Sequence, residues 1–66
     1  MEHYSVDKSA QNSGEHEVHK EDCEFYPNES LYLGFYFDCH QALKQAENFY
    51  PLVDVCRFCC RKDQKG

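Results

Sequence analysis

The five cysteines are the residues of this chain whose type and spacing say most about its chemistry. Cys56 and Cys59 form a Cys-x-x-Cys pair, and two intervening residues allow the backbone to curl until both sulfurs reach one ion at about 2.3 Å. Such a pair supplies half of a tetrahedral zinc site. The spacing therefore predicts one zinc ion per chain, with two further ligands from elsewhere in the sequence.

Cys39 and Cys23 are the predicted third and fourth ligands. Cys39 falls in the first turn of an expected helix, where the helix macrodipole favours a thiolate, and Cys23 opens an expected hairpin. His40 is the main competitor because imidazole is an ordinary zinc ligand, although it lies about 100° around the helix from Cys39. Further candidates for the fourth position are Cys60, His16 and His19.

Disulfides are the competing way to cross-link this chain. Five cysteines are an odd number, so disulfides alone would leave one thiol over. The first residues lack the apolar region of a secretory signal, which predicts a cytoplasmic location. A reducing compartment favours metal binding over disulfides for clustered cysteines. Zinc is therefore the expected cross-link.

Composition divides the 66 residues into unequal parts. Residues 1–22 hold six acidic residues, two lysines and only five apolar residues, which predicts a disordered acidic tail. Residues 23–61 hold every cysteine and nine of the ten aromatic residues, and are the predicted zinc-binding domain. Residues 62–66 are expected to fray. A fold of about forty residues needs a cross-link, because its small core barely offsets about 1.5 kcal/mol of conformational entropy per residue.

The predicted fold is a small α+β domain that a metal ion stabilises. Alternating large apolar residues indicate a strand over 31–37, with 23–26 as its hairpin partner across a turn at Pro27. Leu31, Leu33, Phe35 and Phe37 would then share one face. Asp38 is a helix N-cap, and an amphipathic pattern indicates a helix over 39–50 that ends before Pro51. Residues 52–58 would form a third short strand or a zinc knuckle.

No catalytic signature accompanies these elements. The three glycines are isolated, so the sequence lacks a phosphate-binding loop, and it contains no His-Glu-x-x-His motif. A chain of this length is also too short to enclose a dry active site. We therefore expect a protein that is not an enzyme.

A protein partner, or a second copy of the chain, is the expected ligand. Tyr32 and Tyr36 would stand on an open sheet face, next to a basic edge at Arg57 and Arg61, and exposed aromatic residues of this kind mark binding surfaces. One competing hypothesis is a nucleic-acid-binding zinc finger that uses the same residues and Lys62, although a net charge of −5 opposes it. Another is a thiol redox sensor. No segment suits a membrane span.

Overall fold

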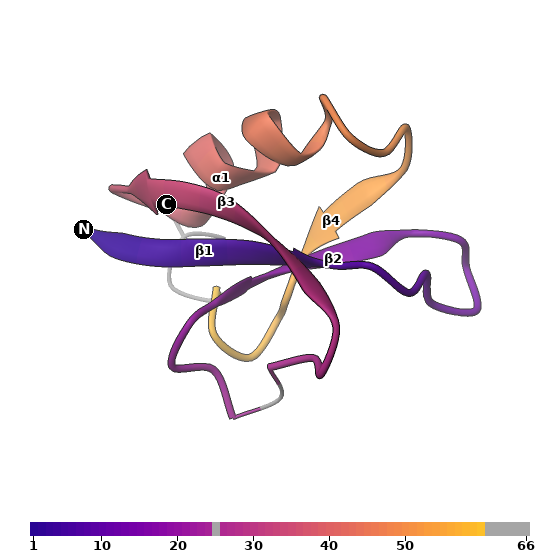
Figure 1. The fold of residues 1–66 in the computed structure, drawn as a ribbon, viewed down its shortest axis with the longest axis horizontal. Helices are drawn as coiled ribbons and strands as arrows, with labels where there is room; N and C mark the ends of the chain where they lie inside the picture. The colour runs from indigo at the N-terminus through magenta and orange to yellow at the C-terminus, as the bar shows by residue number, and fades with distance from the viewer. Residues whose placement is uncertain (25, 61–66) are drawn as a thin grey trace.

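In a computed structural model, which describes residues 1–24 and 26–60, the chain forms one sheet and one helix, β1–β2–β3–α1–β4. The sheet has the order β3-β1-β2-β4; β1 runs antiparallel to both neighbours and β2 runs parallel to β4. α1 covers one side of this sheet, and the loop after β2 lies on the other (Figure 1). The predicted α+β class is confirmed. The elements are β1 (Glu2–Asp7), β2 (His16–Lys20), β3 (Ser30–Tyr36), α1 (Cys39–Ala46) and β4 (Val53–Val55).

The N-terminal segment is not a disordered tail, and that prediction was wrong. It supplies β1 and β2, the two central strands of the sheet. Its few apolar residues alternate with polar ones, so that Tyr4, Val6 and Val18 all reach the core and are at most 1% exposed. A low average apolar content is therefore compatible with folding when each apolar residue occupies a core position. The turn between the strands uses Gly14, whose φ of 92° suits glycine.

β3 forms at the predicted place but with another partner. It pairs with β1, and residues 21–24 and 26–29 lie outside the strands; the Tyr26 hydroxyl donates a hydrogen bond to Ser5 Oγ at 2.8 Å. The predicted hairpin between 23–26 and the strand is therefore absent from the described structure. The true partner, β1, lies in the segment whose composition predicts a tail.

A bulge also changes which side chains of β3 face the core. The register with β1 shifts between Tyr4 and Ser5 and leaves one extra residue on β3. Leu33 is buried at 6% exposure, but Phe35 and Phe37 are exposed at 49% and 71%, so the four predicted residues do not share a face.

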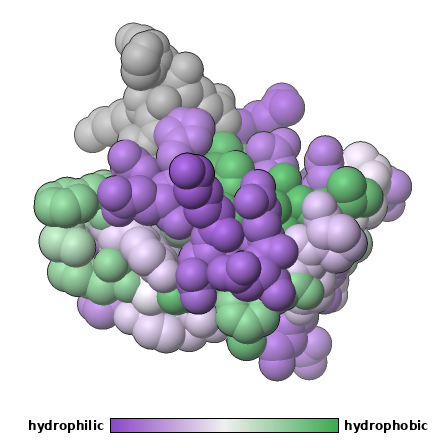
Figure 2. All heavy atoms as spheres, turned by 90° about the horizontal axis from the view of Figure 1, so that it is seen from above, coloured by the Kyte–Doolittle hydropathy of each residue, from purple (hydrophilic) through white to green (hydrophobic). Residues whose placement is uncertain are grey.

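α1 begins where the sequence predicts and ends four residues earlier. The Asp38 carboxylate accepts a hydrogen bond from the Gln41 backbone N–H at 3.0 Å, as an N-cap does. The helix ends at Ala46, before Tyr50, whose place ahead of a proline disfavours helical backbone. Seen from the helix side, hydrophilic residues gather over the middle of the molecule and hydrophobic residues lie to both sides (Figure 2). The buried residues of α1 are Cys39, Ala42 and Ala46.

β4 is short, and its pairing with β2 decides where the C-terminal cysteines lie. The Cys56 N–H continues the parallel ladder by donating to the Val18 carbonyl at 2.9 Å. The chain then turns, and the Cys60 N–H donates to the Cys56 carbonyl at 3.0 Å. We call residues 56–60 the knuckle.

No helix among the described residues is long and apolar enough to cross a membrane.

Candidate metal centre

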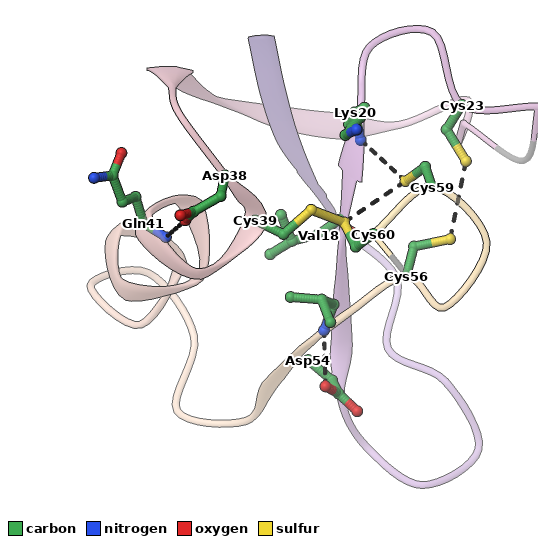
Figure 3. The surroundings of a disulfide bond; sticks show 11 residues. Val18, Lys20, Cys23, Asp38, Cys39, Gln41, Asp54, Cys56, Cys59 and Cys60 are labelled. Atoms are coloured by element: carbon green, nitrogen blue, oxygen red, sulfur yellow. Dashed lines mark hydrogen bonds between the residues drawn. A yellow bond between two sulfur atoms is a disulfide. The ribbon is translucent and has the colours of Figure 1, made fainter. Parts of the chain in front are cut away.

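Four side chains converge at the end of the sheet where β2 and β4 finish. His19 belongs to β2, Cys23 follows that strand, and Cys56 and Cys59 belong to the knuckle; their ligand atoms all lie within 4.8 Å of one another. The Cys23 and Cys56 sulfurs point toward each other at 3.9 Å (Figure 3). A tetrahedron with metal–sulfur bonds of about 2.3 Å has edges of about 3.8 Å. The distance between the Cys23 and Cys56 sulfurs is therefore close to the distance between two thiolates that bind one ion.

Backbone hydrogen bonds hold the donors in place. The Cys23 N–H donates to the Lys20 carbonyl at 3.0 Å, which turns the chain back toward the sheet directly after β2. The Lys20 N–H donates to the Cys59 sulfur at 3.3 Å (Figure 3). Hydrogen bonds of this kind orient metal ligands and tune their charge. The same short segment therefore carries one sulfur donor and supports another.

His19 has a nitrogen that the protein leaves without a hydrogen bond. The side chain is 3% exposed; Nε2 lies 3.3 Å from a Glu17 carboxylate oxygen, and Nδ1 is buried with no partner within the described residues. An unsatisfied buried polar atom costs about 1–3 kcal/mol. A metal ion at Nδ1 would remove that cost, and a carboxylate on the other ring nitrogen is the usual support of a histidine that binds metal.

The pKa shifts of two donors bear on cation binding in opposite ways. Burial lowers the pKa of His19, although Glu17 and Asp7 act in the opposite direction, and the neutral imidazole is the form that binds metal. Burial raises the pKa of the Cys59 thiol to about 12; the Lys20 N–H acts in the opposite direction, and Cys23 and Cys56 raise the pKa further. A bound divalent cation reverses this preference and holds thiols as thiolates.

The structure brings together three of the four predicted ligands and separates the fourth from them. Cys23, Cys56 and Cys59 join the cluster, whereas Cys39 is buried in the first turn of α1 and forms a disulfide with Cys60. His40 is exposed on α1 and is not one of the four donors. His16, a further candidate, stacks on Tyr50 with ring centroids 3.7 Å apart.

Sequence reasoning undervalued His19 because it treated residues 1–22 as a tail. The signal was present as a His-x3-Cys spacing, His19 to Cys23, which resembles the separation of ligand pairs in structural zinc sites. Cys60 was also undervalued. Its position next to Cys59 gave no indication that it would pair with a cysteine 21 residues earlier.

The predicted partner-binding residues lie in different surroundings. Tyr32 is exposed at 56%, but Tyr36 packs against the core and its hydroxyl donates to the Leu33 carbonyl at 2.9 Å. Arg57 is exposed on the knuckle. Arg61, Lys62 and the predicted frayed end at 62–66 lie outside the residues that the structure describes.

Comparison with known proteins supplies no further guide to the site. No family model, no curated protein and no solved structure matches the chain. The described residues do contain a buried group of one histidine and three cysteines that could bind a metal ion.

Proposed function

We propose that the protein is a small, non-catalytic module in which one zinc ion holds the fold and an exposed surface binds a protein partner. The observation that carries the metal is the buried His19 side chain, which groups with three cysteine sulfurs and has one ring nitrogen without a hydrogen-bond partner. Three thiolates and an imidazole in a four-donor set suit Zn²⁺. Four protein ligands would fill a tetrahedral ion and leave no open position for catalysis.

The donors come from two parts of the chain that are distant in sequence. His19 and Cys23 belong to the strand and loop of the N-terminal half, and Cys56 and Cys59 to the knuckle. An ion bound by all four would tie β2 to the end of β4, which is only three residues long. Structural zinc sites contribute to folding in this way.

Purified protein is expected to contain one zinc per chain, measured by elemental analysis. His19→Ala should weaken the affinity for Co²⁺, used as a coloured probe, by about a hundredfold or more, since loss of only an outer-shell partner costs 10–100-fold. His40→Ala is the matched control, because His40 is exposed and is not one of the four donors. A metal-free wild type, or equal effects of the two substitutions, would contradict the proposed site.

The proposed partner surface lies on the sheet face that α1 leaves open. It consists of His3, Tyr32 and Phe35, which we call the aromatic patch. The His3 ring lies 4.5 Å from the Phe35 ring, and its Nδ1 is 2.7 Å from the Tyr32 hydroxyl. Tyr32 and Phe35 are 56% and 49% exposed and belong to β3, whose outer edge meets no other strand of the described residues. Aromatic side chains of this kind are frequent anchors of protein interfaces.

Charge favours a basic protein over nucleic acid as the partner. A hollow of about 540 Å³ beside the metal centre is lined by Asp7, Glu15, Glu17 and Asp54, against one arginine, Arg57. The chain as a whole has a net charge of −5. Phosphate backbones bind surfaces rich in lysine and arginine, so the acidic hollow would repel them.

We propose the cytoplasm as the location of the protein.

Replacing both Tyr32 and Phe35 by alanine should abolish partner binding and leave the zinc content unchanged. Phe49→Ala is the matched control, since Phe49 is also 49% exposed but lies after α1. Proteins that co-purify with the wild type and with the control, and are lost with the double variant, would be identified by mass spectrometry. Sedimentation of the isolated protein tests whether the partner is a second copy. Unchanged co-purification and unchanged sedimentation with the double variant would exclude the patch.

A further inference from the structure

The Cys39–Cys60 disulfide lies directly beside the candidate metal centre. The Cys60 sulfur is 3.8 Å from the sulfur of Cys59, its neighbour in the chain and one of the four donors (Figure 3). Cys39 and Cys60 are fully buried, and no other disulfide occurs among the described residues. All five cysteines of the chain thus gather at one end of the sheet.

The disulfide ties the far end of the knuckle to α1. At its start, the Cys56 N–H bonds to the Val18 carbonyl of β2, which extends the sheet. At its end, Cys60 is covalently joined to Cys39 in the first turn of α1. Cys59 lies between these two attachments, so its position relative to His19 and Cys23 depends on both.

We propose that the Cys39–Cys60 disulfide sets the metal affinity of the His19/Cys23/Cys56/Cys59 site, so that thiol reductants of the glutathione class control metal occupancy. The inference rests on the proposed metal site. Two reductant thiols each give one electron and one proton; the Cys39–Cys60 bond breaks, both cysteines become thiols, and the reductant forms its own disulfide.

Reduction weakens metal binding because it releases the end of the knuckle. The oxidised protein holds Cys59 close to the position that the ion requires, whereas the reduced protein must order this segment when it binds metal. The coupling is reciprocal, because two events that affect each other's equilibrium do so by the same factor. The bound metal therefore makes the disulfide harder to reduce.

Affinity for Co²⁺ tests the proposal, with the Cys39→Ser/Cys60→Ser double variant in place of the reduced protein. We expect the double variant to bind at least tenfold more weakly than the oxidised wild type, in competition with a chelator of known affinity. Leu43→Ala is the control for general loosening of α1, since Leu43 packs against the core on the same helix and belongs neither to the four donors nor to the disulfide, and should change affinity less than threefold.

The reciprocal effect is measured by titration of the wild type in glutathione redox buffers with and without Zn²⁺. Differential alkylation and mass spectrometry report the oxidation state of Cys39 and Cys60 separately from the other cysteines. A tenfold coupling predicts a reduction potential about 30 mV lower with zinc. Equal or tighter Co²⁺ binding by the double variant, or an equal loss with Leu43→Ala, would overturn the inference and leave the metal site standing. Absence of Co²⁺ binding by the wild type would overturn the metal site as well.

Discussion

Removal of zinc by a chelator is expected to unfold the protein. Structural zinc contributes about 10–16 kcal/mol in small domains, and a chain of 66 residues buries too little surface to be more than marginally stable without such help. Without the ion, the buried His19 nitrogen would lack a partner, and the link between β2 and the knuckle through the four donors would be lost. We expect loss of amide dispersion in NMR spectra after chelation, and its recovery when zinc is restored.

The experiment should be run without reductant, so that the Cys39–Cys60 disulfide stays intact and the effect of the metal is isolated. Treatment with a metal-saturated chelator is the control for the chelator itself. A dispersed spectrum of the metal-free protein that matches that of the zinc-bound form would show that the sheet and the disulfide suffice for folding.

Val6→Asp is expected to destabilise the fold by about 4 kcal/mol or more, because it places an unpaired charge in the core. Val6 is fully buried in β1, between Val18 of β2 and Leu31 of β3. Ser9→Asp is the matched control, since Ser9 is exposed just after the strand and should tolerate the same side chain. Urea unfolding followed by circular dichroism measures both. Near-wild-type stability of Val6→Asp would mean that the N-terminal segment is dispensable.

The parts of the fold that local sequence determines were predictable. The start of α1 follows from Asp38, whose carboxylate caps the Gln41 N–H, and the strand at β3 follows from a run of large apolar residues. The bounds of β3 differ from expectation by one residue at each end, and α1 ends four residues earlier than expected. The start of α1 and the position of β3 depend on residues close together in the chain, and such local patterns can be recognised in the sequence.

The predictions that were wrong concern features that depend on contacts between residues distant in the sequence. Tyr4 and Val6 are two of the few apolar residues in an acidic segment. They enter the core only because β2 and β3 pair with β1 on its two sides. The bulge in β3, which exposes Phe35, arises from the register with β1. His19 became a candidate ligand only once β2 lay beside β4, since its spacing to the knuckle has no meaning in a disordered tail.

The two cross-links have a consequence for how the chain would respond to a protease. The connection between α1 and β4 carries exposed Phe49 and Leu52, which makes it an accessible place for cleavage. A single cut there would leave the C-terminal piece joined to α1 through Cys39–Cys60, and joined to His19 and Cys23 through the proposed ion. The molecule can therefore stay in one piece after its backbone is nicked, and only the combined loss of disulfide and metal would release the fragment.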